Sequence, residues 1–202
     1  MAHQASKDLA TEFQFSPPTR DQHGNMFGFC QGRANGRTLI QLNDKGLIVP
    51  FGVSSWEGQR LTLTVCVPST ATQLREFLGA MDEKVKQWAW ENRQQLWRNP
   101  PASKEILDSF HKPLIRPAKE AALTDTLQLK IGMEAKYWNR DKTEGDSSCV
   151  VKGCLAVPLV SATRLWTMNG HEFGLSLTLH HTIVLEAPTE DPMKLFSHVA
   201  FS

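Results

Sequence analysis

Two stretches of the sequence place positively charged side chains beside large aromatic ones. Arg164 and Trp166 lie two residues apart, so in a β-strand they project from the same face. The other stretch holds Lys130, Lys136, Tyr137, Trp138, Arg140 and Lys142. Cations neutralise the phosphates of a polynucleotide, and flat side chains stack on unpaired bases for about 1–3 kcal/mol per base. The two stretches therefore predict a surface that binds a single-stranded nucleic acid without reading its sequence.

A third basic segment would lengthen such a surface. Residues 111–119 are interrupted by prolines and carry Lys112, Arg116 and Lys119 with no acidic residue among them. We expect this segment to form an ordered, extended crossing on the surface. For each cation in the three stretches the alternative is an ordinary solvated position, and for each aromatic side chain it is burial in the core.

The sequence does not predict an enzyme. It contains no glycine-rich phosphate loop, no nucleophile elbow and no His-Glu zinc motif. His180 and His181 are adjacent, and in a regular strand they point to opposite faces and cannot chelate an ion together. We therefore expect no catalysis and no cofactor, with an unrecognised nuclease or processing factor as the alternative.

The cysteines favour free thiols over a metal site. They are Cys30, Cys66, Cys149 and Cys154. Only the last two are close enough in sequence to begin a zinc site, and no second pair with ligand spacing accompanies them. We expect four buried or half-buried thiols, because free cysteine is commonly a small core residue.

Composition indicates one ordinary globular domain without a strong overall electrostatic field. The chain has 202 residues, 41% hydrophobic and 21% charged, with a formal net charge of +1. A polyanionic partner must therefore be attracted by a local patch. The first residues lack the basic and apolar regions of a signal peptide, and no stretch reaches the roughly 18 apolar residues of a membrane span. We expect a cytoplasmic protein that is neither secreted nor bound to a membrane.

The clearest element in the sequence is a long β-hairpin over residues 154–186. Its two arms meet at Asn169-Gly170, and Asn-Gly between alternating apolar runs is a strong hairpin signal. In the second arm Phe173, Leu175, Leu177 and Leu179 share one face. Ser176, Thr178 and His180 alternate onto the other face. We expect the first face to pack in the core and the second to be available for binding.

A long amphipathic helix is predicted for residues 70–98. The apolar stripe consists of Leu74, Phe77, Leu78, Met81, Val85 and Trp88. Ser69 or Thr70, with Gln73, would cap its first turn, and Asn99-Pro100-Pro101 would end it. A short second helix is expected from Ser103 to Phe110.

Further alternating runs predict strands. Residues 60–67 and 126–133 alternate, and the second run continues to residue 138. A shorter hairpin is expected within residues 37–51.

The order of these elements predicts a mainly β, α+β domain with an inserted long helix. The economical architecture is a five-stranded, antiparallel OB-fold barrel spanning residues 36–186, with a helical insertion at residues 69–110. Residues 1–35 are expected to form an N-terminal arm or irregular lead-in, and residues 187–202 a C-terminal tail.

The same order of features resembles a known family. A strand that ends in proline is followed by a long charged helix, an Asn-Pro-Pro stop, a Lys-Pro-Leu segment, an alternating strand and a final long hairpin. The matching residues are Pro68, 70–98, Asn99-Pro100-Pro101, Lys112-Pro113-Leu114, 124–138 and 153–186. The arrangement is similar to that of the single-stranded DNA-binding proteins that T-odd podophages use in replication.

This resemblance implies an OB-fold that binds single-stranded DNA with little sequence preference, as a homodimer, in DNA replication or recombination. It also implies contacts with a replicative DNA polymerase and helicase, in the host cytoplasm. Members of that family end in a long acidic tail that recruits partner proteins. Residues 187–202 contain only Glu190 and Asp191 as acids, a composition that does not fit recruitment of partners through the tail. Two other interpretations stay open: a virion, assembly or interaction domain, and a single-stranded RNA-binding protein.

Overall fold

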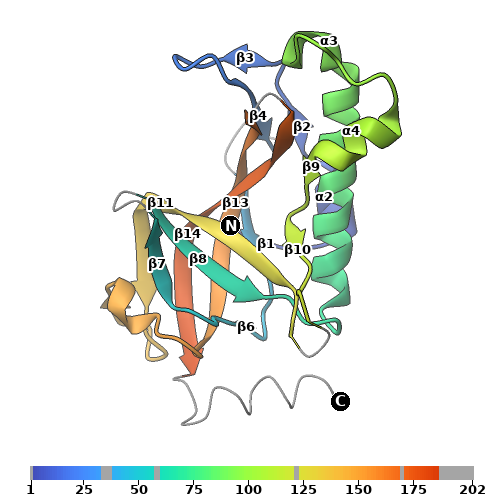
Figure 1. Ribbon diagram of the computed structural model, residues 1–202. Coiled ribbons are helices and arrows are strands. Elements are labelled where there is room, and N and C mark those ends of the chain that lie inside the picture. Colours follow the sequence, from blue (N-terminus) through green and yellow to red (C-terminus); the bar gives the residue numbers. More distant parts are fainter. Residues whose placement is uncertain (1, 33–37, 57–59, 121–122, 169–170, 187–202) are drawn as a thin grey trace.

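The centre of the fold is the predicted long hairpin. A computed structural model describes residues 2–32, 38–56, 60–120, 123–168 and 171–186. Strands β13 (Leu155–Met168) and β14 (Glu172–Glu186) pair antiparallel over their length (Figure 1). The expected turn at Asn169-Gly170 lies outside the described residues. Phe173, Leu175, Leu177 and Leu179 are buried, so the predicted core face of the second arm is confirmed.

The hairpin belongs to a mixed sheet. Beyond β14 follow β11 (Thr126–Trp138), β8 (Arg60–Cys66) and β7 (Val53–Trp56). Strand β11 runs parallel to β14, whereas β8 and β7 pair antiparallel. The expectation of a wholly antiparallel sheet is therefore wrong. Strand β14 lies between β13 and β11, antiparallel to β13 and parallel to β11. Side chains alternate with the same period of two in parallel and antiparallel strands, so the sequence pattern does not reveal the direction of a strand.

Two short strands pair with β13 on its other edge. These are β5 (Leu39–Gln41) and β6 (Leu47–Ile48), and β1 (Ala2–Gln4) adds to β5 in parallel. The expected hairpin within residues 37–51 is wrong, because β5 and β6 each pair with β13. Residues 47–56 contact β13 through β6 and β8 through β7. Residues 47–56 therefore pair with β13 at one end of the strand order β13-β14-β11-β8-β7 and supply β7 at its other end.

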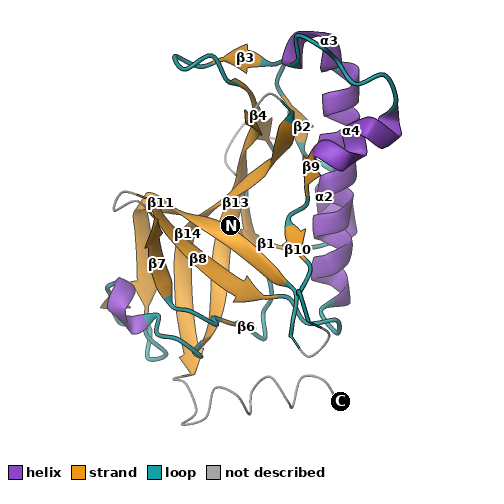
Figure 2. Cartoon of the chain, viewed as in Figure 1, coloured by secondary structure: helices purple, strands orange, loops and turns teal. Residues whose placement is uncertain are grey.

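The helices lie together along one side of the strands (Figure 2). They are α2 (Thr72–Glu91), α3 (Arg93–Leu96) and α4 (Lys104–Phe110). The whole predicted apolar stripe of α2 is buried, and Ser103 caps α4 as expected. The predicted capping box is wrong: Ala71 precedes α2 and its side chain offers no cap.

The first residues are not irregular. They form α1 (Lys7–Thr11), β2 (Gln14–Phe15), β3 (Thr19–Arg20) and β4 (Met26–Gln31). Strand β4 pairs with β13 opposite residues 164–166 and with β2 and β3. Helix α1 packs on α2. This N-terminal segment is therefore part of the folded domain and packs beside the central hairpin.

The predicted surface crossing joins two strands. Its short strands are β9 (His111–Lys112), parallel to β14, and β10 (Ile115–Arg116), antiparallel to β11. The buried carboxylate of Asp82 in α2 accepts hydrogen bonds from the backbone N–H of Leu114 at 3.2 and 3.1 Å. This contact fixes the crossing to the helix. After β11 the chain forms β12 (Glu144–Gly145) and a 3₁₀ turn (Ser147–Cys149).

All four cysteines are free thiols. Cys66 and Cys154 are buried, and burial raises the pKa of each to about 11. Cys30 and Cys149 are half-buried, as expected. Within the described ranges, no three His, Cys, Asp or Glu side chains are grouped closely enough to hold a metal ion. Among the same residues, no helix has the length and apolar character needed to cross a membrane.

Lys84 of α2 ties the N-terminal segment to the body. Its Nζ donates to the carbonyl oxygens of Ala10, Thr11 and Phe13 at 3.0, 3.0 and 2.7 Å. These carbonyls lie at and just beyond the end of α1, where a helix leaves acceptors unpaired and favours positive charge. Burial lowers the pKa of Lys84.

Replacing Lys84 with methionine is expected to lower the free energy of unfolding by about 1–3 kcal/mol, because the carbonyls lose a charged donor. Urea denaturation measures this change. Lys86→Met is the matched control, since Lys86 pairs with Glu83 on the helix surface, where such pairs contribute about 0–1 kcal/mol. Equal losses for the two variants would contradict the assigned role.

Asp125 fixes the start of β11 to the start of α2. Its Oδ2 accepts from Arg75 Nη2 at 2.7 Å, and its Oδ1 accepts from the backbone N–H of Ala118 at 3.0 Å. Arg75 also donates to the carbonyl oxygens of Val67 and Pro68. The hydrogen bond from Arg75, followed by that from Ala118, lowers the pKa of Asp125 below its ordinary value of 3.8.

This lowered pKa predicts a loss of stability in acid. The unfolded chain takes up the proton at a higher pH than the folded chain, so the contribution of Asp125 is present above pH 3.8 and disappears as the pH falls through the folded-state pKa. Thermal unfolding from about pH 6 to about pH 3 should show a shallower acid decline for Asp125→Asn than for the wild type. Parallel curves would show that the pair does not contribute.

Candidate nucleic-acid interface

A β-bulge in β13 aims Arg164 at the polar face of the hairpin. Ala162 pairs with Leu177 and Arg164 pairs with Ser176, so Thr163 is an extra residue on β13. In a regular strand Arg164 would share the core face of Ala162. The bulge instead places it with the hydroxyl groups of β14, since bulges redirect the side chains that follow. We define the polar face as Ser161, Thr163, Arg164 and Trp166 of β13 with Ser176, Thr178 and His180 of β14.

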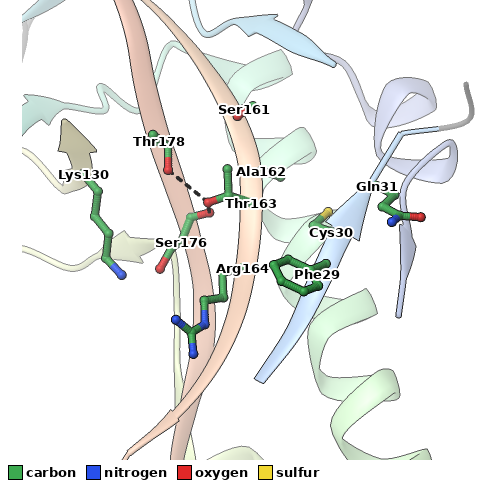
Figure 3. Close-up of a pocket in the computed structure, with 10 residues that line it drawn as sticks. All are labelled: Phe29, Cys30, Gln31, Lys130, Ser161, Ala162, Thr163, Arg164, Ser176 and Thr178. Atoms are coloured by element: carbon green, nitrogen blue, oxygen red, sulfur yellow. Dashed lines mark hydrogen bonds between the residues drawn. The ribbon is translucent and has the colours of Figure 1, made fainter. Parts of the chain in front are cut away.

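The polar face borders an open hollow of about 540 Å³. Figure 3 shows Lys130 of β11 and Arg164 of β13 reaching toward it from two strands, with Ser176 between them. Lys130 pairs in register with Thr178, whose hydroxyl hydrogen-bonds with that of Thr163 at 3.0 Å. The expected neighbourhood of the hairpin and the 126–138 strand is therefore present, and it brings these two predicted cations together.

Arg164 is held from two sides. Its Nη2 donates to Asp21 Oδ2 at 3.3 Å, and its Cζ lies 4.0 Å from the centroid of the Phe27 ring. Burial acts to raise the pKa of Asp21, but hydrogen bonds from the backbone N–H groups of Asn25 and His23 and the charge of Arg164 leave it lowered. The Arg164 side chain is still 41% exposed. It is oriented by its neighbours and remains accessible to an anion.

Trp166 packs against a glycine of β14. Gly174 is its register partner, and a Cβ at position 174 would lie 2.9 Å from the Trp166 ring and 2.9 Å from the carbonyl oxygen of Lys112. Only a residue without a side chain leaves room for this packing. Lys112 is in register with Gly174, and its side chain forms an ion pair with Glu172 at 2.7 Å. Trp166 and Lys112 thus extend the polar face toward the hairpin turn.

The second predicted cluster lies further along β11. Lys136 forms an ion pair with Glu144 at 3.0 Å and lies 5.9 Å from the Trp138 ring centroid. The Trp138 ring N–H donates to His181 Nδ1 at 3.4 Å. Tyr137 is buried in the core, and this burial raises its pKa. Its predicted place on the surface is wrong, because alternation along β11 turns it inward between Lys136 and Trp138.

The adjacent histidines do not point to opposite faces. A second bulge, between the pairs Leu159–His181 and Val160–Leu179, makes His180 an extra residue on β14. His180 Nε2 lies 2.8 Å from Ser161 Oγ on the polar face, and His181 contacts Trp138. The earlier interpretation fails because it assumed a regular strand. The histidines connect the two predicted clusters.

The remaining predicted cations lie at the margins. Arg116 is exposed and pairs in register with Thr126, which precedes Lys130 by two strand periods on one face of β11. Arg140 and Lys142 are exposed in the turn between β11 and β12, and Lys119 is exposed in the turn between β10 and β11. These three are not gathered at the hollow.

The structure adds residues that sequence patterns did not single out. Phe29 of β4 lines the hollow and is 51% exposed, so its ring is accessible to a base. Phe27, Asp21 and the hydroxyl of Thr163 also belong to the site. The period-two spacing of Phe27 and Phe29 could have indicated a strand, but nothing local indicated that it pairs with β13.

This fold is that of phage single-stranded DNA-binding proteins. No protein-family model and no curated protein matches the chain, but it is similar over most of its length to solved structures of that class, as the order of sequence features predicted. Among them is gp2.5, a single-stranded DNA-binding protein encoded by bacteriophage T7, with a TM-score of 0.52 and 12% identity over 77% of this chain and 90% of that chain.

The single-stranded DNA-binding protein from bacteriophage Enc34 is a further similar structure. Alone, it gives a TM-score of 0.42 at 9% identity over 87% of this chain and 92% of that chain. In complex with single-stranded DNA, it gives a TM-score of 0.42 at 10% identity over 87% and 97%.

Proposed function

We propose that this chain is a sequence-tolerant single-stranded DNA-binding protein that acts without catalysis, cofactor or metal. The observation that carries the proposal is the polar face, which borders a hollow lined by Lys130, Arg164 and Phe29. Trp166 follows two residues after Arg164 on the same strand. Cations along a strand path combined with accessible rings suit phosphates and unstacked bases of any sequence.

The barrel that would present this face is of the five-stranded OB type. The order β13-β14-β11-β8-β7, with residues 47–56 touching both of its ends, supports closure into a barrel. The similarity in fold to the T7 protein, which binds single-stranded DNA, supports the proposed ligand.

The wider setting follows from the same family resemblance. We extend the proposal to phage-type DNA replication or recombination in the host cytoplasm, to a homodimer, and to contacts with a replicative polymerase and helicase. Lys136, Trp138 and Arg116 continue the proposed strand path away from the hollow, and Arg140, Lys142 and Lys119 would contact only a longer strand. Tyr137 is left out because its ring is buried.

Fluorescence anisotropy with a labelled oligo-dT tests the proposal. Affinity should fall steeply as salt rises from about 50 to about 200 mM, with about 0.7 added to the negative slope for each phosphate neutralised. Unlabelled duplex should compete poorly. Absence of binding at low salt would overturn the proposal, competition by oligo-U as strong as by oligo-dT would point to RNA, and large assemblies without nucleic acid would point to a structural protein.

A further inference from the structure

Two buried hydrogen-bonding groups belong to residues that are register partners on β13 and β14. Ser176 is 5% exposed, and its Oγ has no hydrogen-bond partner among the described residues. The Nε of Arg164, its register partner, is also buried and without a partner in that part of the chain. A buried hydrogen-bonding group without a partner costs stability, and a ligand that supplies the partner offsets this cost.

The neighbouring hydroxyls are already satisfied. Thr163 and Thr178 hydrogen-bond with each other, and Ser161 bonds with His180. Ser176 therefore differs from the other hydroxyls of the polar face in having no partner within the described chain. It also lines the hollow, between the side chains of Lys130 and Arg164 (Figure 3).

The chemistry of these groups suits an anionic oxygen. The Arg164 Nε carries a proton to donate, and a serine hydroxyl can donate as well. Hydrogen bonds from such donors to a charged oxygen are stronger than those between neutral groups. The guanidinium is already oriented by Asp21 through Nη2 and by the Phe27 ring, so Nε keeps its direction when a ligand arrives.

We propose that Arg164 Nε and Ser176 Oγ form a seat for one phosphodiester oxygen of the bound strand, with Lys130 as the adjacent counter-charge. This inference rests on the proposed function and assigns one anchoring phosphate within it. The exposed Lys130 side chain turns toward the phosphate as it enters the hollow. Asp21 and Phe27 are positioning residues that keep Arg164 in place and do not touch the phosphate.

The first test compares Ser176 with a serine outside the polar face by oligo-dT anisotropy. Ser176→Ala should weaken binding about tenfold, the change expected from one hydrogen bond to a charged group, and leave the salt slope unchanged because no charge is removed. Ser109→Ala, on α4 outside the polar face, is the matched control and should bind as the wild type does. If Ser176→Ala binds oligo-dT as well as the wild type does, the seat is overturned while the proposed function stands.

The second test titrates the wild-type chain, and a variant is used only to assign one resonance. The Arg164 Nε–Hε resonance, assigned by its loss in Arg164→Lys, is followed by NMR during titration with inorganic phosphate against sodium chloride of equal ionic strength. A saturable shift with phosphate alone supports the seat, and an unchanged resonance overturns it. If the wild type binds no oligo-dT, the proposed function fails, and this titration still decides the phosphate seat.

Discussion

Replacing Trp166 with alanine is expected to weaken oligo-dT binding by about ten- to hundredfold, because one stacked base contributes about 1–3 kcal/mol. The ring lies against Gly174, in register with Phe27 and two residues beyond Arg164. A base that stacks there leaves its phosphate within reach of the arginine. The salt slope should not change, since the substitution removes no charge.

Trp90→Ala provides the matched control for this measurement. Trp90 lies on α2, and the Arg93 guanidinium already covers its ring at 4.0 Å from the centroid. Its loss should leave the affinity for oligo-dT unchanged. Tryptophan emission supplies a second measurement, because quenching by oligo-dT should diminish in Trp166→Ala and persist in Trp90→Ala. The reverse pattern would place the bound strand on the helical side of the molecule.

Trp88→Ala should have the largest effect on stability, about 3–5 kcal/mol, because it empties a large buried volume. Trp88 is buried, its ring N–H donates to the carbonyl oxygen of Ser16 at 2.9 Å, and a Cβ at Gly28 would lie 2.8 Å from its ring. The side chain therefore fixes β4 to α2. Since β4 carries Phe27 and Phe29, oligo-dT binding should weaken in this variant as well.

Two companion variants separate the contributions of Trp88. Trp88→Phe keeps most of the ring but leaves the Ser16 carbonyl without this donor, at a cost of about 1–3 kcal/mol. Gln87→Ala alters the exposed neighbouring position and should change the free energy of unfolding by less than about 0.5 kcal/mol. Urea denaturation of the three variants should give this order. If Trp88→Ala were as stable as Gln87→Ala, β4 would not depend on the helix.

Local periodicity was sufficient to predict the elements that form the core. The apolar face of Phe173 to Leu179 and the stripe of Leu74 to Trp88 follow from side-chain spacing within one segment, and both are buried as expected. The resemblance in the order of elements also held, because it rests on the same local features. Strand direction could not be predicted, because the spacing of apolar residues in β11 and β14 is the same whether the two strands pair parallel or antiparallel.

The binding surface depends on irregularities that one strand does not reveal. The bulges at Thr163 and His180 are visible only against the partner strand, yet they redirect the side chains of Arg164 and His181. Tyr137 was misplaced because it was grouped with its basic neighbours, although alternation turns it inward. The contribution of β4 was missed because its pairing with β13 joins residues that are distant in sequence.

Photochemical crosslinking tests the location of the bound strand most directly. The full chain is irradiated with oligo-dT in which one thymine is replaced by 5-iododeoxyuridine, and the modified residues are identified by mass spectrometry. Adducts should form at Trp166 and Phe29 and disappear when unmodified oligo-dT is added in excess. Adducts confined to residues away from the polar face, such as Trp90 or the exposed Phe51, would contradict the assignment of the hairpin as the DNA-binding surface.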